Sequence, residues 1–340
     1  MLSEKQIKEI QTHLEESQNP LFFFDNDNDG LCGMLLLRRF VSRGKGVAIK
    51  SFPDLDENYL KKVDELNPDI VFILDKPFVS LGFIQGLKER NIRIVWIDHH
   101  DIRLEKVVLD GVYYYNSIDV PVTYMCYQIV QNKEDLWIAV IGCISDNYLP
   151  DFWEDFYEKN SELFKKVKSA FEGFYDTDLG KVARILNFGL KDATTNVVRM
   201  IKFLFDVNSP YEILNESKEN QFLWKRFNYL NEKYQRIFDK ARETVRDNLI
   251  FFQYSGQFSL SADIANELIY RYPGKIVVVV YVVGEKVNVS MRGKNVKDLT
   301  EKAIEGLIGA TGGGHRDATG ATLSKSDLME FKKRIEEEVL

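Results

Sequence analysis

The sequence predicts an α/β protein with a mainly parallel sheet in its N-terminal part, a helical insert or connector, and a smaller α/β domain at its C-terminal end. Over residues 1–100, short apolar runs alternate with amphipathic helical patterns, which predicts crossover units and a parallel sheet. Over residues 151–250, helical patterns dominate and strand-like runs are scarce. After residue 251 the two patterns mix again, and 340 residues suit two or three domains.

The first predicted element is a helix that begins at the capping-box residues Ser3 and Gln6 and carries Ile7, Ile10 and Leu14 on one face. The expected strands of this part cover residues 21–24, 47–52, 70–74 and 92–97, and the expected helices cover residues 31–43, 56–66 and 81–90. Because these strands are almost continuously apolar, we expect helices on both faces of the sheet.

The later elements define the other two regions. Helices are expected at residues 179–190, 196–205 and 222–248, with a break at residues 208–210. They are followed by a helix at 261–270, strands at 276–283 and 287–292 joined by a hairpin turn, a helix at 297–308, a glycine loop, a short strand at 321–323 and a terminal helix. The expected domains are therefore residues 1–150, 151–250 and 251–340.

Acidic residues follow the predicted strands of the first domain. Asp25 begins the run Asp25–Gly30, Asp75 follows the strand at 70–74, and Asp98 begins an Asp-His-His motif. A fourth acid, Asp146, ends the apolar run at 136–145. Because the carboxyl ends of parallel strands share one edge of a sheet, we expect these carboxylates to lie together. Like charges repel, so a bound cation is the simplest reason to gather them.

The net charge of the chain, −7, lies entirely in residues 1–150, which hold 16 Lys and Arg against 23 Asp and Glu. The remaining residues are balanced, so the chain is not a globally basic nucleic-acid binder and any basic track is local. Two divalent ions would supply about four positive charges at the acidic strand ends. We therefore interpret the acidic excess as largely a metal site.

The run Asp25–Gly30 also has simpler interpretations. Its spacing matches the start of an EF-hand calcium loop, but the twelfth position is Leu36 rather than Glu, and a predicted strand precedes it. A polar turn whose aspartates cap the next helix is the other alternative. Neither alternative explains why further acids end the neighbouring strands.

Asp75 alone is a weak signal, because an aspartate at a strand end is often a helix cap. The motif Asp98-His99-His100, directly after an apolar strand, is more specific. Carboxylate oxygen with imidazole nitrogen suits manganese, iron or zinc, and an oxygen-rich ligand set favours manganese or magnesium. Two metals that share a bridging aspartate would hold a phosphate and activate water.

A second motif, at residues 312–316, combines three glycines with a histidine and an arginine. Glycines let a backbone approach a ligand closely and point N–H groups at an anion. A flexible turn explains the glycines equally well by themselves. The adjoining His315 and Arg316, with Arg292 upstream, favour phosphate binding, because a guanidinium offers two donors to phosphate oxygens.

The order of these motifs resembles that of the DHH phosphoesterase superfamily with a DHHA1-type C-terminal domain. The resemblance covers nearly the whole chain except residues 151–250, and its departure is Thr311, where many relatives carry a fourth glycine. The first motif has the RecJ form, with Asp25 where relatives that act on small substrates use histidine. The long helical region and compact size look most like archaeal RecJ-like nucleases, with the Hef-associated nucleases as a narrower sub-assignment.

The resemblance implies a role for each motif residue. Two manganese ions, for which magnesium is a substitute, would be bound with Asp75 as the bridge by Asp25, Asp27, Asp29, Asp75, His99 and Asp146. The catalytic group would be Asp75, His99, His100 and Asp98, of which the last two support the metal ligands. The substrate would be bound by Arg292, Gly312, Gly313, Gly314, His315 and Arg316.

The function that the resemblance implies is a manganese-dependent exonuclease or phosphodiesterase of DNA repair or replication. It would hydrolyse single-stranded DNA or RNA from an end, with the 3′→5′ direction favoured. Two rivals stay open: a phosphodiesterase of cyclic dinucleotides or short oligonucleotides, which shares every catalytic residue, and a non-catalytic scaffold of a repair or replication complex. A repair helicase or nuclease and a second copy of the chain are the partners that the family suggests.

Residues 181–202 are a candidate track for a nucleic-acid strand. They are rich in Lys and Arg, with Asp192 as the one acid, and Phe188 within them and Phe203 beside them would stack bases. The more frequent meaning of such a pattern is the solvated and buried faces of ordinary helices.

Cys32, Cys126 and Cys143 lie in apolar stretches without a CxxC spacing, which predicts buried, reduced thiols. His13 is expected on the surface of the first helix. No run of eighteen apolar residues and no signal-peptide core occurs, so we expect no membrane span and a cytoplasmic location.

Overall fold

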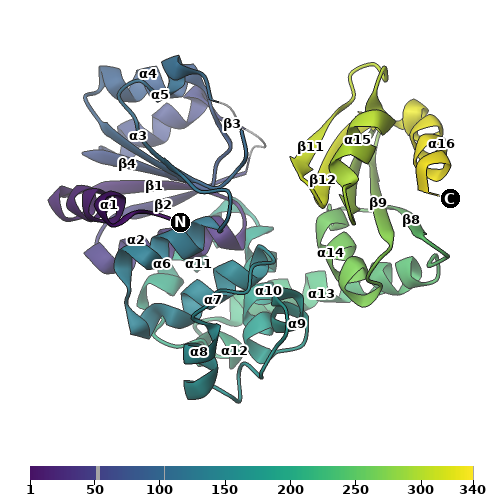
Figure 1. Cartoon of the computed structure of the whole chain (residues 1–340). Helices are drawn as coiled ribbons and strands as arrows, with labels where there is room; N and C mark the ends of the chain where they lie inside the picture. Colours follow the sequence, from purple (N-terminus) through teal and green to yellow (C-terminus); the bar gives the residue numbers. More distant parts are fainter. Residues whose placement is uncertain (51–53, 103, 340) are drawn as a thin grey trace. The chain divides into compact units, whose positions relative to one another are not determined.

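The computed structural model describes residues 1–50, 54–102 and 104–339. The chain divides into two compact units, Met1–Phe227 and Asn228–Leu340, and each is described by itself (Figure 1). The predicted α/β class is confirmed, with a parallel sheet in the first unit and a smaller α/β sheet in the second.

The sheet of the first unit has five strands in the order β2 (Lys45–Ile49), β1 (Pro20–Asp25), β4 (Ile70–Leu74), β6 (Arg93–Asp98) and β7 (Tyr113–Asn116). Every neighbouring pair is parallel. The three central strands are therefore β1, β4 and β6, and their carboxyl ends lie side by side.

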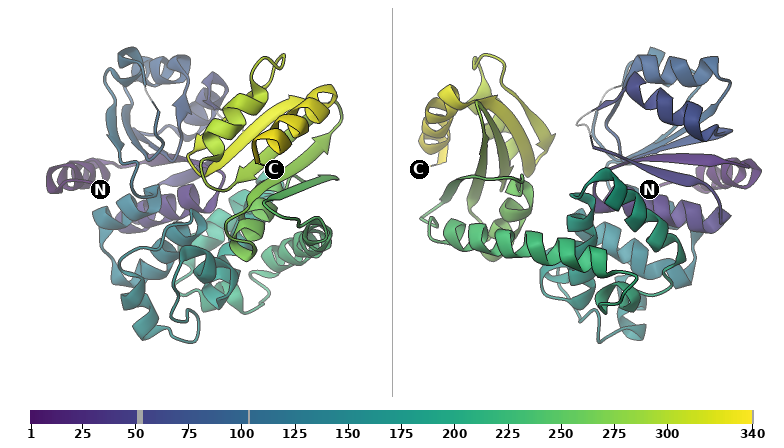
Figure 2. Two further views of the ribbon diagram at one scale, coloured as in Figure 1. Left: turned by 45° about the vertical axis from the view of Figure 1, so that its right-hand side comes forward. Right: turned by 180° about the vertical axis from the view of Figure 1, so that it is seen from behind.

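Helices cover both faces of this sheet, as the apolar strands predict (Figures 1 and 2). On one face, alternate strand residues such as Phe23, Ile73 and Trp96 form a buried core with α3 (Leu60–Leu66) and α4 (Leu81–Glu89). On the other face lies α2, at Asn28–Val41, which follows β1 directly and is buried over most of its length. The sheet edge that carries the acids is thus held rigidly from both sides.

Further α-helices of the first unit pack around this sheet and beside α2. They are α1 (Glu4–Glu16), α5 (Lys106–Leu109), α6 (Val122–Val130), α7 (Leu136–Ser145), α8 (Trp153–Lys159), α9 (Ala170–Tyr175), α10 (Asp178–Leu190), α11 (Thr194–Asp206), α12 (Tyr211–Leu214) and the start of α13 (Gln221–Arg242). A short pair of parallel strands, β3 (Asp54–Leu55) and β5 (Phe78–Val79), lies apart from the main sheet. The apolar run at residues 136–145 is the helix α7, which contacts α2, α6 and α10.

The second unit has a five-stranded sheet in the order β11 (Thr311–His315), β12 (Ala318–Ser324), β10 (Lys286–Arg292), β9 (Ile276–Val283) and β8 (Leu249–Ser255). Only the pair β8 and β9 is parallel among the described strands of this sheet. The helices α15 (Val296–Ile304) and α16 (Leu328–Val339) share a core with the strands, and α14 (Ser261–Arg271) packs on β9 and β10.

Three local expectations differ from the structure. The glycine segment is the edge strand β11 rather than a loop, because its backbone pairs with β12. The strands β3, β5, β7 and β8 lie where no strand was expected. His13 is buried, not exposed, since its ring packs 4.2 Å from that of Tyr113, measured between centroids. The three cysteines are free and buried, as predicted.

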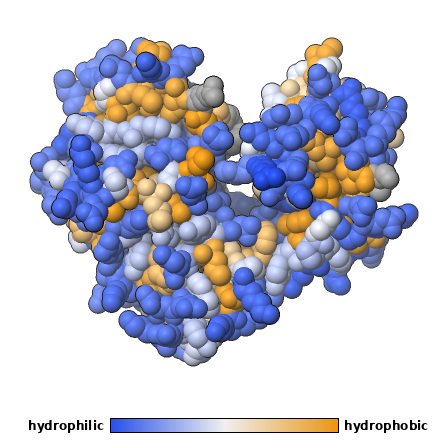
Figure 3. Space-filling view, in the orientation of Figure 1, coloured by the Kyte–Doolittle hydropathy of each residue, from blue (hydrophilic) through white to orange (hydrophobic). Residues whose placement is uncertain are grey.

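Figure 3 shows mostly hydrophilic residues on the face drawn, with hydrophobic residues in scattered groups. Among the helices that the structure describes, none combines the length and the apolar character needed to cross a membrane.

We expect Gly30→Ala to lower the free energy of unfolding by at least about 2 kcal/mol. A Cβ atom at Gly30 would lie 2.6 Å from the carbonyl oxygen of Asp25, so the tight passage from β1 into α2 would have to open. The matched control is Gly33→Ala in the same helix, whose Cβ would meet nothing closer than side-chain atoms at 3.3 Å. Urea unfolding measures both variants, and equal losses would contradict the close approach at Gly30.

Candidate metal centre

The central strands bring three aspartates to one edge of the sheet. Asp25 ends β1, Asp98 ends β6, and Asp75 is the first residue after β4. Since β4 lies between β1 and β6 in the sheet, Asp75 lies between Asp25 and Asp98. His99 and His100 follow Asp98 directly and add two imidazoles to this edge.

The passage from β1 to α2 adds two further carboxylates. Asp27 is the N-cap of α2, and its Oδ1 accepts a hydrogen bond from the N–H of Gly30 at 2.9 Å. Asp29 is buried and accepts hydrogen bonds from the N–H groups of Val122 and Thr123, at 2.8 Å and 2.7 Å. Asp29 therefore fixes the start of α6 as well as contributing charge to the site.

Asp75 has an unusual backbone and an unusual side chain. Its φ of 58° is left-handed, a conformation that a residue other than glycine adopts only when its surroundings fix it. Its N–H donates to the carbonyl oxygen of Ile97 at 3.0 Å. Its side chain is buried, yet Oδ1 accepts no hydrogen bond from any described residue. That oxygen lies 3.2 Å from Nε2 of His99 and 3.8 Å from Nδ1 of His100.

The two histidines are oriented by carboxylates. Nδ1 of His100 lies 2.9 Å from Oδ1 of the fully buried Asp98, whose other oxygen accepts from the backbone N–H of His100. Nδ1 of His99 lies 3.8 Å from Oδ2 of Asp146, the exposed C-cap residue of α7. Such carboxylate–imidazole pairs are typical of the support around metal ligands.

Three groups of side chains in the first unit have ligand atoms that all lie within 4.8 Å of one another. They are Asp25, Asp27 and Asp75; Asp75, Asp98 and His100; and Asp29, His99 and Asp146. The structure thus brings together every predicted metal ligand and all four predicted catalytic residues. Carboxylate oxygens with imidazole nitrogen suit manganese, iron or zinc, and the excess of oxygen ligands favours manganese or magnesium. The buried acceptor of Asp75 without a donor is what a cation would satisfy.

The charges at this edge shift the pKa values of its members. Desolvation, followed by the charges of Asp25 and Asp29, raises the pKa of Asp27 to about 7. Desolvation and the neighbouring carboxylates raise the pKa of Asp75 well above its usual range. Burial acts to lower the pKa of His99, but the surrounding carboxylates, first among them Asp29, outweigh it and raise the pKa. For the two aspartates, burial and the repulsion between neighbouring carboxylates act in the same direction.

Lys76 belongs to this site, although the sequence did not point to it. Its side chain is entirely buried, and its Nζ donates to Oδ1 of Asp25 at 2.8 Å. The available signal was a lysine that directly follows an apolar strand and its terminal aspartate, where burial of the charge requires an acidic partner.

The predicted substrate-binding residues lie in the second unit, on β10, on β11 and just after it. Gly314 has a φ of 137°, and a Cβ there would lie 2.6 Å from the carbonyl oxygen of Ala318, so the backbone requires glycine. A Cβ at Gly313 would meet nothing within 4 Å, which leaves that position open to a ligand. Gly312 and the exposed His315 complete the edge strand.

The two arginines of this group already have partners within the second unit. Nε of Arg292 donates to Oδ1 of Asn266, and Nη1 donates to the carbonyl oxygens of Met291 and Thr319. Nε of the exposed Arg316 donates to Oδ1 of Asn295 at 2.6 Å. These contacts fix the guanidinium of Arg292 against β12, through Thr319, and that of Arg316 just after β11.

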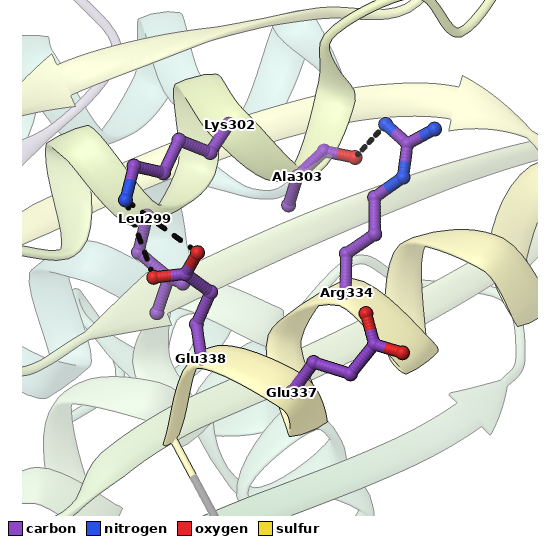
Figure 4. Close-up of a pocket in the computed structure, with 6 residues that line it drawn as sticks. All are labelled: Leu299, Lys302, Ala303, Arg334, Glu337 and Glu338. Atoms are coloured by element: carbon purple, nitrogen blue, oxygen red, sulfur yellow. Dashed lines mark hydrogen bonds and ion pairs between the residues drawn. The ribbon is translucent and has the colours of Figure 1, made fainter.

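A pocket in the second unit is lined by none of these residues. Figure 4 shows its lining, in which Lys302 pairs with Glu338 and Arg334 donates to the carbonyl oxygen of Ala303. Its charges are largely neutralised by one another, and we assign no ligand to it.

At residues 181–202, the contacts favour the alternative of ordinary helix faces over a track that stacks bases. Phe188 is only 3% exposed and packs on Phe227, so it does not lie on a surface that a base would reach. The Arg199 guanidinium lies 4.1 Å from the centroid of the Phe222 ring. Phe222 in turn lies edge-on to Phe203. These contacts are those of ordinary helix packing.

The comparisons with known proteins agree with this architecture. Residues 251–340 match the family model of the DHHA1 domain. No protein of curated function matches the chain by sequence. Among solved structures, RecJ of Thermus thermophilus in complex with Mn²⁺ has a TM-score of 0.64 at 14% identity, over 99% of this chain and 55% of that protein. This chain therefore spans only about half of that RecJ.

Two further solved structures match nearly end to end. An exonuclease RecJ bound to manganese has a TM-score of 0.65 at 15% identity, over 99% of this chain and 95% of the other. The DHH domain of a protein described as a member of a family of ribosomal proteins has a TM-score of 0.67 at 15% identity, over 98% of this chain and 89% of the other. At such identities the likeness is one of fold.

In the metal-free protein, we expect the free energy of unfolding to fall as the pH rises from about 4 to about 7. The carboxyl of Asp27 has a pKa of about 7 in the native state and an ordinary value of 3.8. Between these values the native chain keeps a proton that the unfolded chain has lost, so rising pH favours unfolding. Urea unfolding at a series of pH values in the presence of a chelator measures the slope.

The control for this prediction is Asp27→Asn. The amide oxygen still caps α2 through Gly30 but the side chain cannot ionise. The decline should become shallower, and it should not vanish, because the pKa of Asp75 is raised as well. An identical slope in the wild type and the variant would contradict the assignment of this proton to Asp27.

Proposed function

We propose that this chain, whose residues 251–340 match the DHHA1 family model and whose fold is RecJ-like, is a metal-dependent phosphoesterase of the DHH/DHHA1 superfamily. The single observation that carries the proposal is the buried Oδ1 of Asp75. This oxygen has no hydrogen-bond donor among the described residues and lies close to two histidines and among further carboxylates. The ligand set is rich in oxygen, which favours two Mn²⁺ ions with Mg²⁺ as a substitute.

Metal ions bound at this edge would supply Lewis-acid chemistry, lowering the pKa of a water and neutralising charge on a phosphoryl group. The chain itself supplies the orientation. Asp75, held by its backbone at the junction of β4 and the neighbouring strands, would offer one carboxylate to two of the ligand groups. Asp98 would hold a proton on Nδ1 of His100 and keep that imidazole turned towards the site.

We further propose that the substrate is single-stranded DNA or RNA, hydrolysed from an end, with the 3′→5′ direction favoured, in DNA repair or replication. In the second unit, the open position at Gly313 and the backbone of β11 would take the sugar–phosphate chain. The RecJ proteins of the same fold, one of them described as an exonuclease, support this substrate class.

Strands labelled at the 5′ or the 3′ end, in DNA and RNA and in a series of lengths, test the substrate. Incubation with Mn²⁺ is expected to shorten long single strands progressively from one end, and the position of the label reports the direction. Activity confined to dinucleotides and other very short oligomers would overturn the exonuclease in favour of a small-substrate phosphodiesterase. No hydrolysis of any strand would favour a non-catalytic scaffold.

We expect Asp75→Asn to lower the rate of Mn²⁺-dependent hydrolysis by at least about a thousandfold. Asparagine tolerates the left-handed backbone of this position, so the fold should survive, while the amide cannot act as an anionic ligand. The matched control is Asp101→Asn, which removes an exposed carboxylate one residue after His100. The rates of Mn²⁺-dependent hydrolysis by the two variants test this prediction, and the control should keep the wild-type rate. Full activity of Asp75→Asn with Mn²⁺ would refute the metal site.

A further inference from the structure

Lys76 is buried completely although it carries an ammonium group. Its Nζ donates to Oδ1 of Asp25 at 2.8 Å, and its carbonyl oxygen accepts a hydrogen bond from Nε1 of Trp96 at 2.9 Å. Both ends of the residue are therefore fixed. Burying a charge is unfavourable, and an apolar side chain would fill the same space more readily. The charge of Lys76, rather than its volume, is what calls for an explanation.

The ion pair joins two ligand-bearing strand ends. Asp25 ends β1, and Lys76 follows the Asp75 position at the end of the neighbouring β4. Asp25 and Asp75 are also members of one ligand group with Asp27. Lys76 is thus a cation that is built into the wall of one candidate metal site.

The charges of the ligand groups show what this cation does. With all carboxylates ionised, Asp25, Asp27 and Asp75 carry −3, and the ammonium of Lys76 brings the group to −2. The group of Asp29, Asp146 and a neutral His99 also carries −2. With the charge of Asp75 counted in the first group only, each group then matches one divalent cation. Without Lys76 the first group would match a trivalent ion instead.

We infer that Lys76 is a fixed counter-charge that sets the Asp25–Asp27–Asp75 group to the charge of one divalent cation, and that it thereby selects divalent over trivalent ions. The inference rests on the proposed function, because it takes this group to be a metal site. The attraction between a cation and the group scales with the product of their charges. Removal of the ammonium therefore strengthens the binding of a trivalent ion more than that of a divalent ion.

The experiment measures the dissociation constants of two ions on the metal-free full chain, Mn²⁺ by electron paramagnetic resonance and Tb³⁺ by luminescence. In Lys76→Met, the ratio of the Mn²⁺ to the Tb³⁺ dissociation constant should rise by about tenfold or more at the altered site. The group of Asp29, His99 and Asp146 keeps its charge and is the internal reference. A ratio that does not change would overturn the inference.

Two further variants separate charge from structural damage. The double variant with Asp25→Asn and Lys76→Met loses one charge of each sign, so its group returns to −2 and its ratio should lie within about threefold of the wild type. Lys76→Arg keeps the charge and should keep the ratio. If Lys76 had only a structural role, its substitution would weaken the binding of both ions to the same extent. A double variant whose ratio equals that of Lys76→Met would refute the role of Lys76 as a counter-charge.

The outcomes distinguish this inference from the proposed function. A wild-type chain that binds both ions, with a ratio that no variant changes, overturns the role of Lys76 and leaves the metal site intact. A wild-type chain that binds neither ion overturns both. If circular dichroism shows that Lys76→Met does not fold, the comparison of the double variant with Asp25→Asn alone decides. The single variant leaves the group at −1 and should lower the ratio, whereas the double variant should keep the wild-type ratio; two equally lowered ratios would contradict the inference.

Discussion

Carboxylates that repel one another are held together at the carboxyl ends of β1, β4 and β6, and much of the first unit serves to hold them there. Parallel pairing brings the three strand ends side by side, and helices on both faces keep the sheet rigid. Asp75 lies at the centre with a left-handed backbone and a buried oxygen that no described donor satisfies. The repulsion between these carboxylates is unfavourable in the metal-free chain, and a bound cation would neutralise it.

The same side chains also determine local structure. Asp27 caps α2, and both oxygens of Asp29 accept the first N–H groups of α6. Asp146 ends α7, the buried helix that packs against α2 and α6. Helix positions and ligand positions are therefore linked. A substitution that moved one of these helices would move a ligand, even if the site itself kept its composition.

In the second unit, the glycines of the edge strand β11 differ in why the structure has glycine there. Gly314 is required by its own backbone, whereas a side chain at Gly313 would meet nothing, so packing does not explain the absence of a side chain there. The edge strand leaves its outer side without a neighbouring strand among the described residues of that sheet. Both features suit a backbone that an extended anionic ligand approaches closely.

The sequence predicted the fold class and the grouping of the acids well, because apolar runs that end in aspartate specify both the strand and its polar edge. The sequence was a poorer guide to local structure and burial where these depend on tertiary contacts. The run at 136–145 has no clear period since α7 is buried all round, and β11 forms only because β12 pairs with it. His13 is buried by Tyr113, which is far away in the sequence.

Lys76 shows the same limit inside the site. A lysine that follows a strand is normally a solvated surface residue, and only the position of Asp25 on the neighbouring strand explains its burial. The left-handed backbone of Asp75 was equally invisible, because aspartate is common in ordinary conformations. Long-range pairing, rather than residue type, determines both features.

Anomalous diffraction at the manganese edge, from crystals of the full chain grown with Mn²⁺, is the most direct test of a metal centre at this edge of the sheet. We expect two peaks per chain within coordination distance of the strand-end ligands, with the carboxylate of Asp75 in contact with both. Crystals in which these side chains are well ordered but no anomalous peak lies among them, or in which peaks lie only elsewhere on the chain, would contradict the metal centre.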